Sequence, residues 1–290
     1  MAPQPPPRDG ELILTLSCPD RRGIVARVAG FVAHRNGNIL DSHQFGDPDE
    51  SVFFMRIRLA TPGPADVDGW RAAFGPIAQE LGMAWELHDA SRRPRVLVLV
   101  SREGHCLNDL LYRWRTGGIA AEIVGVASPY DDFASLARAY DLPYHRIPGP
   151  GTPPVELDHS VLELVDRERV ELVVLARFMQ VLGSDACGAL AGRAINIHHS
   201  FLPSFKGASP YRQAHERGVK LIGATAHYVT EELDEGPIIE QEVARVDHSH
   251  SVGELARVGR DVECVALARA VRWHVERRVL LHGRRTVVFR

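Results

Sequence analysis

The chain has little lysine and few cysteines, and it contains no long uninterrupted hydrophobic run. Lys206 and Lys220 are the only lysines among 34 basic residues, and the formal net charge of the 290 residues is −3. The arginines are scattered along the sequence, which argues against a surface built to bind nucleic-acid phosphates. The longest apolar runs, such as residues 96–100, have the length of a strand and are far too short to span a membrane.

The four cysteines (Cys18, Cys106, Cys187 and Cys264) lie far apart, with no CxxC or Cys/His ligand spacing. Neither a disulfide framework nor a metal site is therefore predicted. The start, MAPQPPPRDG, is proline-rich and polar and lacks the apolar segment of a secretory signal. We interpret residues 1–11 as a disordered tail and expect a cytoplasmic protein.

The composition, 45% hydrophobic and 24% charged residues, is that of a globular protein, and the length favours two domains. Hydrophobic periodicity over residues 12–91 predicts a strand, a helix, two strands, a helix and a strand, in that order. These elements are expected at residues 12–17, 20–35, 38–44, 51–59, 67–81 and 83–88. Asp20 is the expected N-cap of the first helix, and Asn36-Gly37 its stop. This order is that of a ferredoxin-like βαββαβ unit.

After a polar linker around Pro94, strands and helices alternate. Apolar strands are expected at 95–100, 121–127 and 171–176, and helices at 107–115, 131–140 and 154–168. Alternation of this kind predicts an open, mostly parallel α/β sheet in a Rossmann-like domain over residues 95–290. Such sheets bind their ligands beyond the carboxyl ends of the strands.

Two segments of this second domain carry candidate catalytic side chains. Asn196 and His198 end a short apolar strand, and their spacing of two places both on one side of an extended chain. An amide beside an imidazole suits the stabilisation of an oxyanion on a carbonyl. Asp234 follows a second apolar strand, in Leu233-Asp234-Glu235-Gly236-Pro237-Ile238, and could orient a histidine or take a proton from water. Each residue alone is compatible with an ordinary turn or packing role; together they favour catalysis.

Residues 196–203 and 224–239 resemble the superfamily of 10-formyltetrahydrofolate-dependent formyltransferases and hydrolases. The resemblance covers the chain from about residue 95 and implies a catalytic trio of Asn196, His198 and Asp234. It also implies that residues 179–182 form the loop that binds the folate ring. The candidate substrate-binding residues are Met179, Gln180, Val181, Leu182, His227 and Gly236. The alternative for 178–182 is the core of a helix, and His227 could equally pack away from the site.

Within this superfamily, the chain resembles the formyltetrahydrofolate deformylases. Glycinamide ribonucleotide formyltransferases carry a glycine-rich loop after the first strand that binds the acceptor's phosphate. Here residues 100–108 contain one glycine, and Glu103 would repel a phosphate. The stretches 105–107 and 207–214 also resemble the deformylases. Residues 12–59 resemble an ACT domain, which the deformylases carry and the transferases lack.

The resemblance implies hydrolysis of 10-formyltetrahydrofolate to formate and tetrahydrofolate, with formate supplied to purine synthesis. Asp234 would activate or position the water and keep His198 charged, while His198 and Asn196 stabilise the oxyanion. No metal or redox cofactor is expected. The rivals are transfer of the formyl group to an amine, and a folate or amino-acid sensor without turnover.

The resemblance to an ACT domain implies an amino-acid effector, with glycine and methionine as first candidates, and a homo-oligomer. The candidate effector-binding residues are Asp20, Gly23, Asn36 and Asn38. The identity of the effector, the number of subunits and the contacts of the folate's glutamate tail stay open. So do the individual roles of His199, His227 and Lys206.

Overall fold

The computed structural model describes residues 10–202 and 210–290 and divides into two compact units. The first unit contains the chain up to Arg93 together with Arg277–Leu280 and Val287–Arg290. The second contains Pro94–Glu276 and Leu281–Thr286. Among the described residues, we find no helix with both the length and the apolar character needed to cross a membrane.

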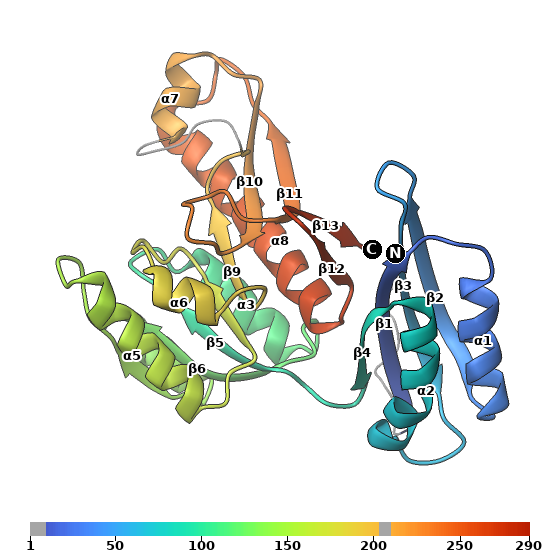
Figure 1. Ribbon diagram of the computed structural model, residues 1–290. Coiled ribbons are helices and arrows are strands. Elements are labelled where there is room, and N and C mark those ends of the chain that lie inside the picture. The colour runs from blue at the N-terminus through green and yellow to red at the C-terminus, as the bar shows by residue number, and fades with distance from the viewer. Residues whose placement is uncertain (1–9, 203–209) are drawn as a thin grey trace. The chain divides into compact units, whose positions relative to one another are not determined.

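The first unit is an antiparallel four-stranded sheet with two helices on one face (Figure 1). The strands lie in the order β2-β3-β1-β4. In chain order the elements are β1 (Glu11–Pro19), α1 (Ile24–His34), β2 (Asn38–Asp47), β3 (Val52–Ala60), α2 (Val67–Leu81) and β4 (Ala84–Asp89). The predicted ferredoxin-like βαββαβ order is confirmed.

The alternation of side chains along β3 separates a hydrophobic face from a charged one. Met55, Ile57 and Leu59 belong to the core that the sheet shares with α1 and α2. Arg56 and Arg58 occupy the intervening positions, and both are buried. Their charges are balanced by Asp41 at 2.9 Å from Arg56 and by Glu11 at 2.8 Å from Arg58.

Two short stretches near the C-terminus complete this unit. Arg278 is 1% exposed; its Nη1 donates to the carbonyl oxygen of Phe289 at 3.1 Å, and its Nη2 lies 3.9 Å from Asp41. The Phe289 ring lies 5.7 Å from that of His43. Residues 95–290 were expected to form the second domain. The structure groups these two stretches with the first unit, because Arg278 and Arg56 share the carboxylate of Asp41.

The start of α1 differs from its prediction. The N-cap residue is Gly23, at φ 94°, and no side chain caps the helix, so the prediction that Asp20 is the N-cap is wrong. The reason is that β1 continues through Pro19 and the Asp20 amide donates to the Ser51 carbonyl at 2.8 Å, which leaves a turn before the helix. The predicted stop is confirmed, since α1 ends at His34 and Asn36 has a left-handed φ of 54°.

The second unit is built on a seven-stranded sheet of order β11-β10-β9-β8-β5-β6-β7. The five strands from β9 to β7 in this order are parallel, and β10 and β11 are antiparallel to their neighbours. The predicted mostly parallel sheet is therefore confirmed. The strands are β5 (Arg95–Leu99), β6 (Glu122–Ser128), β7 (Tyr144–Arg146), β8 (Leu172–Leu175), β9 (Ala194–His198), β10 (Leu221–Tyr228) and β11 (Ile238–Arg245). A hairpin of β12 (Val279–His282) and β13 (Arg285–Val288) follows near the C-terminus.

The helices of this unit are α3 (His105–Arg115), α4 (Ala134–Ala139), α5 (Pro154–Arg167), α6 (Ser184–Ala189), α7 (Pro210–Glu216) and α8 (Val252–Val275). Residues of α5 and α6 form a hydrophobic core with β5, β6 and β8. Helix α8 packs across β9, β10 and β11 and contacts α3 and α7 (Figure 1). A capping box of Ser251 and Glu254 fixes the start of α8. This helix contains Glu263, which lines a cavity of the second unit.

Candidate active site

A cavity of about 580 Å³ opens in the second unit beyond the carboxyl ends of β8 and β9. This is the edge at which open α/β sheets bind ligands. Polar side chains of β9, β10 and the following turn line one part of it. The segment after β8 contributes a mainly apolar wall, and a cluster of charged residues lines the remainder.

Strand pairing brings the polar residues together. Asn196 and His198 lie on β9 with the predicted spacing of two, and the antiparallel register sets His227 of β10 opposite Asn196. Side chains directly opposite each other in such a pair share one face of the sheet. Thr225, opposite His198, accepts from the Leu202 amide at 3.0 Å and donates to the Ser200 carbonyl at 3.0 Å. The register therefore places the site's side chains and also anchors the chain after β9.

Asp234 reaches this face from the turn between β10 and β11. It has a left-handed φ of 58°, and its Oδ1 lies 3.2 Å from His198 Nδ1 and 3.7 Å from His227 Nε2. The turn is closed by the Tyr228 amide, which donates to the Pro237 carbonyl at 2.9 Å. A side chain at Gly236 would overlap the Tyr228 carbonyl oxygen. Gly236, predicted to bind substrate, is absent from the residues that line the cavity; the close approach at this turn requires glycine.

The pairing with histidine fixes the protonation state of Asp234. Burial alone would raise its pKa, but hydrogen bonds from His198 and His227 hold it well below the usual range. Asp234 is therefore a carboxylate at neutral pH. His198 is 7% exposed, and its other ring nitrogen, Nε2, is buried without a hydrogen-bond partner among the residues that the structure describes. A buried polar atom left in this state is available to a bound substrate.

His227 faces the site, which decides between the two roles left open for it. Its Nδ1 lies 2.9 Å from the Tyr228 carbonyl oxygen, which can only accept, so Nδ1 carries the hydrogen. Its Nε2 lies 3.3 Å from the Asn196 side-chain nitrogen and 3.7 Å from Asp234 Oδ1, so it contacts both residues. His227 thus orients Asn196, whose amide keeps a second hydrogen for another acceptor.

The apolar wall is the loop that follows β8, and several tethers hold it. Residues 178–182 are not helical. Phe178 and Leu182 are buried in the core, whereas Met179 and Val181 are 61% and 59% exposed, and all four line the cavity. The Met179 amide donates to Ser101 Oγ at 2.9 Å, and the Gln180 side chain donates to the Pro148 carbonyl at 3.1 Å. Loop residues Met179–Leu182 thus present an apolar surface of fixed shape.

Both halves of the chain match known families. Residues 94–271 match the formyl transferase family, and residues 12–67 match the ACT domain. A formyltetrahydrofolate deformylase from Corynebacterium sp. (strain P-1) is 48% identical over 96% of this chain and 98% of its own length. The crystal structure of formyltetrahydrofolate deformylase from Burkholderia mallei is 50% identical, covers 97% of this chain and 100% of that chain, and superposes with a TM-score of 0.91. The chain belongs to the formyltetrahydrofolate deformylase family.

A transformylase matches only part of the chain. Glycinamide ribonucleotide transformylase 1 from Symbiobacterium toebii is 32% identical, covers 68% of this chain and 95% of that chain, and has a TM-score of 0.65. The deformylase relatives match nearly the full length. The predicted family, fold and hydrolase class are therefore confirmed.

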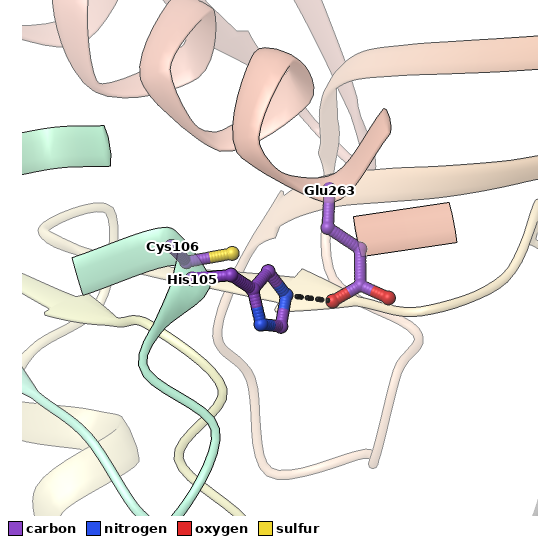
Figure 2. A group of neighbouring side chains, drawn as sticks. All are labelled: His105, Cys106 and Glu263. Atoms are coloured by element: carbon purple, nitrogen blue, oxygen red, sulfur yellow. Dashed lines mark hydrogen bonds and ion pairs between the residues drawn. The ribbon is translucent and has the colours of Figure 1, made fainter. Parts of the chain in front are cut away.

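The charged cluster of this deformylase-family site was not predicted as a unit. Arg177, at φ 62°, donates through Nε and Nη2 to Glu103 Oε2 at 3.0 and 2.8 Å. Its Nε also lies 3.4 Å from Glu263, which is 1% exposed. Glu263 accepts further from Tyr211 at 2.6 Å and pairs with His105 at 2.7 Å (Figure 2). His105 and Glu263 are 158 positions apart, so no local pattern could have joined them.

His105, Cys106 and Glu263 are also residue types that bind transition metals, and their ligand atoms lie within 4.8 Å of one another (Figure 2). The surroundings do not fit a cation. Both Glu263 oxygens already face donors, one of them the permanently charged Arg177. A hydrogen bond with Cys264 and burial raise the pKa of the Cys106 thiol well above its usual value, so it is not a thiolate.

The candidate effector residues of the first unit do not come together within one copy. Asp20 and Gly23 precede α1, whereas Asn36 and Asn38 follow it. An eleven-residue helix separates the two pairs by roughly 16 Å at 1.5 Å per residue. Lys206, whose role the sequence left open, lies outside the described residues.

Gly236→Ala tests whether the turn positions Asp234. The new Cβ would overlap the Tyr228 carbonyl, so the turn must shift and carry Asp234 away from His198. A displacement of about 1 Å costs roughly 10²-fold in turnover. We expect formate release, the activity expected from the sequence, to fall by that factor. Gly188→Ala, in α6 with open space around it, is the control and should retain activity. A fully active Gly236→Ala protein would show that the turn does not need this close approach.

Proposed function

We propose that this chain hydrolyses 10-formyltetrahydrofolate to formate and tetrahydrofolate, and that Asn196, His198 and Asp234 carry the reaction. The observation that supports this assignment most directly is His198 in the cavity. One ring nitrogen is paired with a carboxylate and the other is buried without a partner among the described residues. Deformylases match the chain over nearly its whole length, which makes water the formyl acceptor.

The folate lies along the apolar wall, with its formyl group at the polar residues. Met179 and Val181 offer exposed apolar surface to an aromatic ring, and the backbone of this loop offers hydrogen-bonding groups. His198 and Asn196 border the same cavity and receive the carbonyl oxygen. This arrangement leaves the formyl carbon open to water.

In the first step, the water oxygen bonds to the formyl carbon and the carbonyl π electrons move to the oxygen. His198 Nε2 and the free hydrogen of the Asn196 amide donate to this oxyanion. The Asp234 carboxylate orients the His198 ring, balances its positive charge and takes one proton from the attacking water. Because Asp234 is a weak base, it holds that proton only transiently.

In the second step, the oxyanion re-forms the carbonyl and the carbon–nitrogen bond breaks. The electron pair of that bond goes to the folate nitrogen, which takes the proton from Asp234. The formic acid produced loses its remaining proton to solvent and leaves as formate. The balance is one amide and one water in, and one amine, one formate and one proton out. The chain's own side chains and water supply every step, so the proposal calls for no cofactor.

Asp234→Asn keeps the shape of the side chain but removes the negative charge and the proton acceptor. We expect formate release to fall by roughly 10²–10⁴-fold, the size of a lost acid–base contribution, while folate affinity changes little. A single-turnover assay without any amine measures formate and folate binding separately. Asp166→Asn, an exposed aspartate on α5, is the control. Formate production by Asp234→Asn at the wild-type rate would remove Asp234 from the mechanism.

The same assay separates the rivals. A formyltransferase would release no formate until an amine is added, and a sensor would bind folate without turnover. Wild-type protein that makes formate with water alone supports the hydrolase. Absence of formate under those conditions would overturn it.

We also propose that the first unit binds an amino acid and that copies of the chain associate to form the site. The match to an ACT domain supports an amino-acid ligand. The helix start at Gly23 has open space beside it and backbone amides suited to a carboxylate. Since Asn36 and Asn38 lie at the far end of α1, only a second copy could bring them to this start. A ligand that changes activity must bind two arrangements of the protein with different affinity.

Gly23→Ala tests this effector site. A Cβ there would occupy the open space at the helix start, at a φ of 94° that disfavours side chains. We expect wild-type formate release to respond to glycine or methionine, and the variant to lose that response while keeping its basal rate. Gly30→Ala, within the same helix and also facing open space, is the control. A wild-type enzyme that ignores a panel of amino acids would leave the unit as an assembly platform.

We also propose that the protein is cytoplasmic. All four cysteines are free thiols, the usual state in a reducing compartment. Folate-dependent formate production in that compartment would supply purine synthesis.

A further inference from the structure

His199 follows the proposed catalytic histidine and lines the same cavity. Neighbouring residues of a strand point to opposite faces, but β9 ends at His198 and the chain bends at His199. The two imidazoles consequently stack, with ring centroids 5.0 Å apart and an interplanar angle of 30°. The centroid of the Tyr211 ring lies 6.4 Å from that of His199. His199 therefore neighbours both His198 and Tyr211, and Tyr211 donates to Glu263 of the charged cluster.

Burial and the neighbouring charges together set the protonation state of this imidazole. Burial, the guanidinium of Arg177 and the neighbouring His198 lower the pKa of His199 to about 4, against the opposing effect of Glu263 and Glu103. Tyr211 and Arg260 also border the cavity there. At neutral pH His199 is uncharged, so one of its ring nitrogens carries a lone pair and can only accept a hydrogen bond.

We propose that His199 accepts a hydrogen bond from the attacking water and aims its oxygen at the formyl carbon. This inference rests on the hydrolysis proposed above. Asn196 and His198 are donors committed to the oxyanion, and the Asp234 carboxylate already faces two imidazoles. A water held by Asp234 alone would keep rotational freedom. A second acceptor beside His198 would hold the water's other hydrogen. With both hydrogens held, the water is oriented for attack, and such orientation speeds a bimolecular step.

The role of Arg177 follows from the same arrangement. A protonated His199 would donate to water and turn the oxygen lone pairs away from the carbon. Arg177 opposes that protonation, and Glu103 and Glu263 balance its charge and hold its guanidinium in place. The buried cluster thus sets the electrostatic conditions under which His199 can accept.

Substitutions at His199 test the proposal. His199→Leu removes the acceptor, and we expect kcat for formate release to fall by about 10²-fold while KM for the folate stays within roughly twofold. His199→Gln keeps an acceptor oxygen and should recover to within about tenfold of wild type. His159→Leu, at an exposed histidine of α5, is the control. Equal losses in the Leu and Gln variants, or a rise in KM that accounts for the loss, would overturn the proposal.

Hydroxylamine in the assay gives a readout that a merely structural role would not move. It competes with water for the formyl carbon and yields a hydroxamate in place of formate. Because His199 is proposed to serve water in particular, His199→Leu should raise the ratio of hydroxamate to formate. If both products fall by the same factor, the inference fails while hydrolysis stands. If wild type releases no formate at all, the proposed function itself fails.

The pH profile tests the part played by Arg177. Wild-type kcat should be flat between pH 6 and 8, well above the pKa of about 4 for His199. In Arg177→Gln the pKa of His199 rises, so activity should fall as the pH is lowered through this range. Arg177→Lys keeps a positive charge and should stay closer to the wild-type profile. An Arg177→Gln profile parallel to that of wild type would contradict the proposed control of His199.

Discussion

The contact between Asp234 and His198 is the interaction on which the rest of the site depends. It joins a residue of β9 to a turn beyond β10, so it exists only if the register of those two strands is correct. A slip of one residue in β10 would turn His227 away from the face of the sheet that carries Asn196 and His198. The same register places Thr225 where it anchors the chain after β9. The turn adds its own requirement, a position at Gly236 without a side chain. Backbone geometry therefore determines which side chains meet at this site.

Arg177 links the two other walls of the cavity. Its carbonyl accepts from the Ser101 amide at 3.3 Å, and the Ser101 hydroxyl accepts from the Met179 amide that opens the apolar loop. Its side chain meanwhile joins Glu103 to Glu263. The loop that shapes the folate surface and the cluster that surrounds His199 are thus held by one residue. A buried group of this kind does not have to add stability, since desolvation offsets much of the ionic attraction. The effect of Arg177 here is to hold a positive charge at a fixed place near His199.

The sequence predicted those features that local pattern encodes. Helix α2 was expected at residues 67–81 and has those bounds in the structure. Its apolar residues recur with a regular helical period, and Gly82 ends it in a left-handed conformation. Asn196 and His198 could be recognised because two neighbouring side chains on one strand need no tertiary information. Asp20 was misassigned as a cap because the length of β1 is decided by its pairing with β3. The charged cluster could not be found, since its members come from separate elements 74 and 158 positions apart. Long-range packing makes that cluster, and no short motif reports it.

The similarity to a transformylase sharpens the question of what makes such a site a hydrolase. An amine acceptor brings its own binding groups and can be oriented by contacts far from the reacting atom. Water offers only two hydrogens and two lone pairs, so its orientation must come from acceptors set close to the carbon. The chain meets this requirement with two neighbouring environments: Asp234 stays ionised against His198, while burial and Arg177 keep His199 uncharged. Two neighbouring histidines thereby act in opposite senses, one as a donor to the oxyanion and one as an acceptor from the nucleophile. The difference between them arises from the burial of His199 and from which charge lies beside each ring.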